Sequence, residues 1–119
     1  MKLEQMKRAT VEALEDVKGR DIVVLDTSHL SSLFDCMIIA SADSTRQTRA
    51  MANRVQQRLK ALGASVLGVE GEREGDWILV DLGSLIVHIM HPATRAYYNL
   101  EELWGPQSLP AGGRQAAAT

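Results

Sequence analysis

Two long segments of the chain alternate apolar and polar residues with the spacing of an amphipathic helix. In residues 2–18 apolar side chains recur every three or four positions, and Gly19 follows as a natural stop. Residues 45–62 repeat this spacing, with Ser44 placed to cap the segment and Gly63 placed to end it. The pattern predicts two helices, each with one face turned towards a core.

Short apolar runs outside these two segments predict strands. Pro92 follows the last run and can begin a short helix through Tyr98. Because strands and helices alternate at first and a hairpin follows, we expect an α/β (α+β) fold, with a mixed five-stranded sheet and flanking helices chiefly on one face. The strands are expected at 21–27, at 36–42, at 65–70, and twice within "GDWILVDLGSLIVHIMHP" at 75–92.

The dipeptide Gly83-Ser84 joins the last two predicted strands and determines how they pair. Glycine at the first central position suits a type II′ turn, which places Leu82 opposite Leu85. Side chains then alternate between two faces of the hairpin. One face is wholly aliphatic and is expected to meet the core: Ile78, Val80, Leu82, Leu85, Val87 and Ile89. The other, which we call the mixed face, consists of Trp77, Leu79, Asp81, Ile86, His88 and Met90.

The mixed face is poor core material, because a carboxylate buried without a partner is costly. Aromatic and methionine side chains beside a few polar groups are typical of a protein-binding patch. The alternative is that a helix covers this face and that Asp81 merely pairs with His88. The register alone leaves both interpretations open.

Length and composition indicate an ordinary globular domain. With 119 residues and a net charge of −2, the chain can bury a real core and is not a general nucleic-acid binder. We expect one domain over residues 1–105 and a disordered Gly/Pro/Gln/Ala-rich tail over 106–119. No apolar run approaches the ~20 residues of a membrane span, and the first residues lack the apolar region of a signal peptide. One cysteine, Cys36, lies in an apolar strand, so we predict a buried thiol in a cytoplasmic protein without membrane contact.

Motifs for catalysis or metal binding are not visible. His88 and His91 are three residues apart, so on a strand they point to opposite faces and cannot share an ion. The sequence has no P-loop, no G-x-G-x-x-G and no G-x-S-x-G turn. We therefore predict no enzyme activity, no metal site and no cofactor.

The predicted helix at 45–62 is basic and contains no acidic residue. Its outer face could contact phosphate, although a solvated face is the more ordinary explanation. The basic residues are Arg46, Arg49, Arg54, Arg58 and Lys60.

Two long stretches carry a family resemblance: "ALEDVKGRDIVVLDTSHLSSLFDCMIIASADSTRQTRAMA" and "GVEGEREGDWILVDLGSLIVHIMHPATRAYYNLEELWG". They resemble the ribosomal silencing factor family, also called RsfS or iojap-like, over about residues 10 to 105. The motifs that match in order are Glu70-Gly71, Trp77 to Asp81, Val87-His88 and Tyr98 to Trp104.

The resemblance implies a translation repressor that binds the large ribosomal subunit through ribosomal protein fourteen. Bound there, it would sterically block subunit joining, notably in starvation and stationary phase. The family also resembles the nucleotidyltransferase fold without its catalytic residues. Such an enzyme needs two acidic residues, two positions apart, to hold metal ions. The nearest candidate here is Asp35-Cys36-Met37, in which methionine takes the place of the second carboxylate. A nucleotide-binding or nucleotidyltransferase-like enzyme is the alternative.

The resemblance favours the binding interpretation of the mixed face. Trp77 is the expected anchor, Asp81 and His88 the expected hydrogen-bonding groups, and Trp104 is expected to attach the C-terminal segment to the core. A minor rRNA contact through the helix at 45–62 and a homodimer of the free protein are compatible with this interpretation. The predicted partner-binding residues are Trp77, Leu79, Asp81, His88, Met90 and Tyr98.

Overall fold

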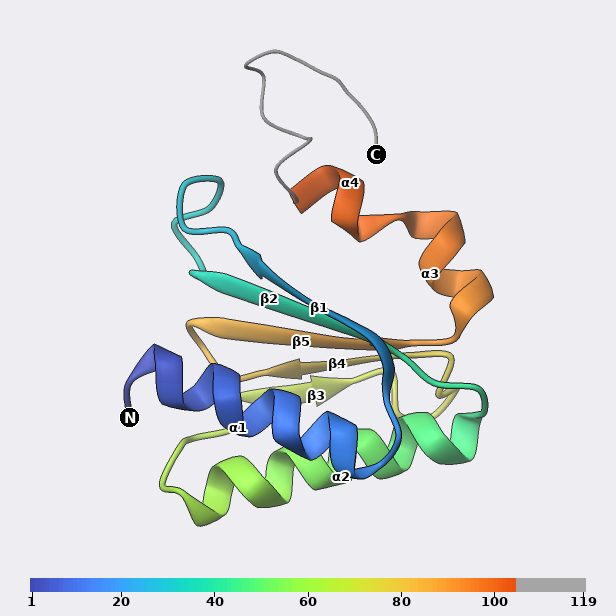
Figure 1. Ribbon diagram of the computed structural model, residues 1–119, viewed down its shortest axis with the longest axis horizontal. Coiled ribbons are helices and arrows are strands. Elements are labelled where there is room, and N and C mark those ends of the chain that lie inside the picture. Colours follow the sequence, from blue (N-terminus) through green and yellow to red (C-terminus); the bar gives the residue numbers. More distant parts are fainter. Residues whose placement is uncertain (105–119) are drawn as a thin grey trace.

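The computed structural model describes residues 1–104. Its five strands form one sheet in the order β1-β2-β5-β4-β3 (Figure 1). Strands β2 and β5 are parallel, and the other neighbouring strands are antiparallel. The predicted mixed five-stranded sheet is confirmed, and the predicted tail at 106–119 lies outside the described residues. The strands are β1 (Arg20–Asp26), β2 (Cys36–Ser41), β3 (Gly68–Glu70), β4 (Trp77–Asp81) and β5 (Leu85–Met90).

Two long helices lie below the sheet in Figure 1 and two short helices lie above it. The long helices, α1 (Leu3–Asp16) and α2 (Thr45–Ala61), are those predicted from the helical spacing. Ser44 caps α2 as predicted, since its side-chain oxygen accepts a hydrogen bond from the amide of Gln47 at 3.1 Å. Within residues 1–104, no helix is both long enough and apolar enough to cross a membrane.

The short helices are α3 (Pro92–Tyr98) and α4 (Leu100–Trp104). Pro92 begins α3 as predicted, and Asn99 ends it in the left-handed conformation, at φ 48°. The sequence pattern did not predict α4, because five residues are too few to show a helical period.

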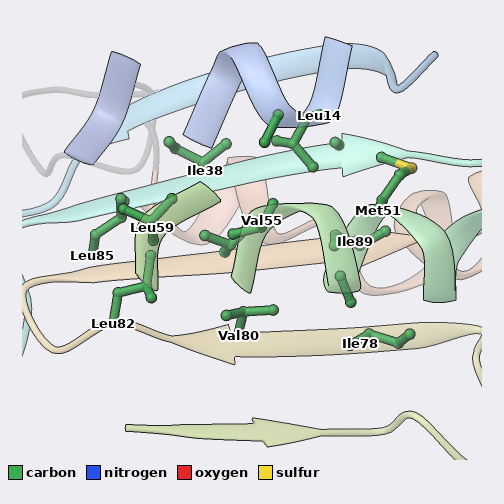
Figure 2. Packing of buried hydrophobic residues seen from close by; sticks show 14 of the residues in the cluster. Leu14, Ile38, Met51, Val55, Leu59, Ile78, Val80, Leu82, Leu85 and Ile89 are labelled. Carbon is green, nitrogen blue, oxygen red and sulfur yellow. The ribbon is translucent and has the colours of Figure 1, made fainter. Parts of the chain in front are cut away.

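Aliphatic side chains fill the space between the long helices and the sheet (Figure 2). Leu14 of α1 and Met51, Val55 and Leu59 of α2 meet the hairpin there, and each is fully buried. Each such side chain contributes roughly 1.5–3 kcal/mol when removed from water, so this layer holds α1 and α2 on the sheet. The hairpin supplies the six residues of its aliphatic face: Ile78, Val80, Leu82, Leu85, Val87 and Ile89.

The hairpin pairs in the predicted register. Trp77 lies opposite Met90, Asp81 lies opposite Ile86, and the amide of Leu82 donates to the carbonyl of Leu85 at 3.0 Å. Gly83 has a φ of +90°, whereas Ser84 does not adopt a positive φ, as a type II′ turn requires. The mixed face therefore lies on the side of the sheet opposite α1 and α2.

Candidate functional site

The C-terminal helices cover part of the mixed face. Met90 is fully buried in an apolar cluster with Met37 and Ile39 of β2, against which Leu100 and Trp104 pack. The predicted attachment of the C-terminal segment by Trp104 is thus confirmed, and its ring lies 5.3 Å from that of Phe34, between centroids.

Two of the predicted site residues are therefore not available to a partner. Met90 has no exposed surface, and His88 is only 6 % exposed. The expectation that these two side chains are partly exposed is wrong, because Leu100 and Trp104 pack over Met90 and the indole of Trp77 lies against His88. The covering helix that the register left open as an alternative is present, but it covers only part of the face.

The remainder of the mixed face stays partly exposed, and we call it the open half: Trp77, Leu79, Asp81 and Ile86. Leu79 lies opposite Glu70 of the edge strand β3, and Asp81 lies opposite Gly68. The open half thus combines three apolar side chains with the carboxylate of Asp81, and the carboxylate of Glu70 lies beside it. The partial exposure predicted for Trp77, Leu79 and Asp81 is observed.

Trp77 is held in place by two rings. Its indole Nε1 donates a hydrogen bond to Nδ1 of His88 at 2.9 Å, and its ring lies 4.8 Å from that of Tyr98, between centroids. Tyr98 is half-exposed and contacts Tyr97 in an edge-on arrangement at 5.0 Å. The rings of His88, Trp77, Tyr98 and Tyr97 thus contact one another in succession. The series begins at the buried His88 and ends at Tyr97, which is 82 % exposed.

Sequence reasoning missed Tyr97 as a candidate for the site. The hairpin register identifies side chains on β4 and β5 only, and it does not extend to α3. The available signal was the pair Tyr97-Tyr98 on a short helix directly after the hairpin, where at least one ring must face solvent.

His88 acts within the protein rather than on its surface. Its burial lowers the imidazole pKa to about 4, so the ring is neutral at physiological pH. Because Nδ1 accepts the hydrogen bond from Trp77, the ring proton is carried by Nε2. Asp81 does not pair with His88: its side chain accepts a hydrogen bond from the amide of Gly83 at 2.9 Å and stabilises the turn.

We expect the buried His88 to make folding stability depend on pH. Between pH 6.5 and about 4 the unfolded chain binds a proton on this residue and the native protein does not, so stability falls as the pH is lowered through this window. At about 1.4 kcal/mol per pKa unit, the loss reaches about 3 kcal/mol and is absent above pH 6.5. Urea denaturation at a series of pH values measures it. His88→Gln is the control, and an equally steep acid slope in that variant would contradict the assignment.

Three of the five basic residues of α2 are engaged within the chain. Arg54 and Arg58 both form ion pairs with Asp16 of α1, at 3.1 and 2.7 Å. The guanidinium of Arg49 donates to the carbonyl of Glu72 at 2.9 Å and also to that of Arg73. The carboxylates of α1 therefore offset part of the charge of Arg54 and Arg58, while Arg49 keeps its charge but is oriented towards the loop at 72–73.

In the segment Asp35-Cys36-Met37, the second and third side chains are buried in apolar surroundings. Cys36 is buried as predicted, and burial raises the pKa of its thiol. Met37 is buried in the apolar cluster beneath α4. In residues 1–104, no group of three or more His, Cys, Asp or Glu side chains could hold a metal ion.

Comparison with known proteins identifies similar chains. The family model described as "Ribosomal silencing factor during starvation" matches residues 1–118. A ribosomal silencing factor RsfS from Chromobacterium violaceum is 51% identical over 107 residues, covering 90% of this chain and 88% of the relative. A mouse protein named "Mitochondrial assembly of ribosomal large subunit protein 1" is 34% identical over 111 residues, covering 91% of this chain and 49% of that protein.

The fold is also found in a crystal structure. A protein from Chromobacterium violaceum superimposes with a TM-score of 0.87 at 47% sequence identity, covering 98% of this chain and 92% of that one. The arrangement described above is therefore shared with a solved relative.

Proposed function

The chain belongs to the ribosomal silencing factor family, and from this premise we propose that it represses translation at the large ribosomal subunit. In this proposal it binds ribosomal protein fourteen in the cytoplasm and sterically blocks the small subunit from joining, notably in starvation and stationary phase. The name of the mouse relative, which refers to assembly of the large ribosomal subunit, supports the choice of subunit.

The open half of the mixed face is the proposed docking surface. The observation that carries this assignment is that Trp77 and Leu79 stay partly exposed on β4, although the C-terminal helices cover the neighbouring part of the same face. A large aromatic side chain that is already held by His88 and Tyr98 loses little freedom on binding, and this favours its use as an anchor.

The proposed role needs no catalysis. A nucleotidyltransferase-like enzyme would require a second carboxylate near Asp35, and the side chain two residues later, that of Met37, lies in an apolar cluster. The likeness to the nucleotidyltransferase fold itself stays a prediction.

Sedimentation with purified large subunits, followed by addition of small subunits, tests this proposal. We expect the wild-type protein to travel with large subunits and to prevent joining. Leu79→Asp should weaken binding at least about tenfold, because the new carboxylate would have to be desolvated in an apolar interface. Leu33→Asp is the matched control, since Leu33 is an 84 % exposed leucine outside the open half, and we expect it to bind as the wild type does.

Each outcome of this experiment has a defined meaning. If the wild-type protein does not bind large subunits, the proposed function is wrong. If folded Leu79→Asp binds normally, the open half is not the docking surface. Binding that falls steeply with salt and depends on Arg46 would indicate an rRNA contact through α2 instead. Because an exposed apolar sheet also permits a homodimer, the hydrodynamic mass of the free protein is measured first.

A further inference from the structure

Arg95 is the only buried residue with a permanent charge in the part of the chain that the structure describes. Its Nη1 donates to the side-chain oxygen of Ser41, at the end of β2, at 2.8 Å. Its Nε and Nη2 both lie 2.9 Å from the same carboxylate oxygen of Glu101 on α4. One guanidinium on α3 thus joins the sheet and the following helix.

The pairing of a buried guanidinium specifies geometry. Removing a guanidinium from water is costly unless its donors are paired, so any arrangement that keeps Arg95 buried but separates it from Ser41 and Glu101 is strongly disfavoured. The planar, multiply donating group fixes orientation as well as distance, because its N–H bonds point in set directions.

The short helices have few other attachments. Helices of seven and five residues are below the roughly 12–15 residues at which an isolated helix becomes marginally stable in water, so they depend on tertiary contacts. Arg95 is the only buried residue of α3, and α4 contains none. Apolar attachment comes from Leu100 and Trp104 on α4 and from the contact of Tyr98 with Trp77.

We infer that Arg95 positions α3 so that Tyr97 and Tyr98 extend the docking surface beyond the hairpin, an inference that rests on the proposed function. Tyr98 lies against the anchor Trp77, and Tyr97 lies against Tyr98 with most of its ring in solvent. The docking surface is then composite: β4 supplies Trp77 and Leu79, and α3 supplies the two tyrosines. Arg95 is a positioning residue that does not itself touch the partner.

Hydrogen exchange of the free, full-length protein tests the positioning role without the ribosome. We expect Arg95→Ala to raise the exchange rates of amides in α3 and α4 at least tenfold, while amides of β2 and β5 keep their protection. Arg95→Lys should give an intermediate result, because one ammonium cannot bridge Ser41 and Glu101 with the fork of a guanidinium. Unchanged exchange in α3 and α4 of Arg95→Ala would overturn the inference.

A double-mutant cycle in large-subunit binding tests the docking role. We expect Tyr97→Ala and Arg95→Ala to weaken binding about fivefold and tenfold, and the double variant to be little weaker than Arg95→Ala alone. If Arg95→Ala already removes Tyr97 from the partner, deleting the Tyr97 side chain as well costs little further binding free energy. Multiplicative effects would show that Arg95 acts through general stability and would overturn the inference.

The two measurements separate the failure of this inference from the failure of the proposed function. If wild-type protein does not bind large subunits, the docking role of Tyr97 falls with the proposed function. Hydrogen exchange then still decides whether Arg95 positions α3.

Discussion

Trp77→Ala should weaken binding to the large ribosomal subunit by about thirty-fold to several hundred-fold. The loss of a central aromatic anchor typically costs ~2–4 kcal/mol of binding free energy. Trp77 meets the conditions for such an anchor, because its indole is partly exposed on β4 and its orientation is fixed by His88 and Tyr98. Co-sedimentation with large subunits over a range of protein concentrations measures the effect.

The structure adds a stability cost to this prediction. Trp77 packs against the apolar cluster beneath α4, and its removal leaves Nδ1 of the buried His88 without its donor. We expect Trp77→Ala to lower the free energy of unfolding by about 2–3 kcal/mol, so its folded fraction must be measured beside its affinity.

Trp77→Phe is the matched control. It keeps an aromatic ring beside Tyr98 but removes the N–H group that His88 accepts, so we expect a folded protein with intermediate affinity. A folded Trp77→Ala variant with wild-type affinity would show that Trp77 is not an anchor. A Trp77→Ala variant that unfolds would assign Trp77 to the core rather than to the docking surface.

The hairpin could be predicted residue by residue because its geometry is local. A two-residue turn with Gly83 at its first central position fixes the pairing, and the pleat then assigns each side chain to a face. The succession of strands along the chain and the start of α3 at Pro92 follow from similarly local signals, whereas the order of the strands in the sheet does not. The exposure of Trp77, Leu79 and Asp81 was accessible to the same reasoning.

The burial of His88 and Met90 could not be predicted in this way. Met90 is covered by Leu100 and Trp104 of α4, whose five residues show no period, and the indole that lies on His88 is placed by side-chain contacts that a strand register does not give. Arg95 and Ser41 are 54 residues apart, and no local pattern pairs them. Sequence patterns identified the six residues of the mixed face but not the two of them that are buried, His88 and Met90.

The basic helix illustrates the same limit. In the sequence, residues 45–62 contain arginine and lysine without any acidic residue, and this indicates an exposed positive face. In the fold, α1 lies beside α2, and Asp16 pairs with both Arg54 and Arg58. Which helix faces α2 is a property of the tertiary structure, so the number of free positive charges could not be read from α2 alone.

Gly71→Ala should have the largest effect on stability of any glycine replacement considered for this chain, about 3–5 kcal/mol in the free energy of unfolding. Gly71 has a φ of +87°, which already strains a side chain, and an added Cβ would lie 2.1 Å from the carbonyl oxygen of Trp77. That contact is with backbone, so either β4 moves at its first residue or the 71–75 loop moves away from it, and we expect β4 to move.

Two other glycines separate strain from steric overlap. Gly63→Ala carries a φ of +93° with nothing within 4 Å of the new Cβ, so strain alone should cost about 1 kcal/mol. Gly68→Ala has neither a positive φ nor a neighbour within 4 Å and should be close to neutral. Urea denaturation of the three variants measures the series.

The Gly71 series also bears on the docking surface. Because the overlap of Gly71→Ala is with the backbone of the proposed anchor, we expect relief of the clash to displace Trp77 from His88 and Tyr98. We therefore expect the folded fraction of Gly71→Ala to bind large subunits more weakly than Gly63→Ala does, although neither glycine lies in the open half. If Gly71→Ala unfolds at the same urea concentration as Gly68→Ala, the 71–75 loop relaxes without moving β4, and Trp77 is held more firmly by its two ring contacts than by the loop before it.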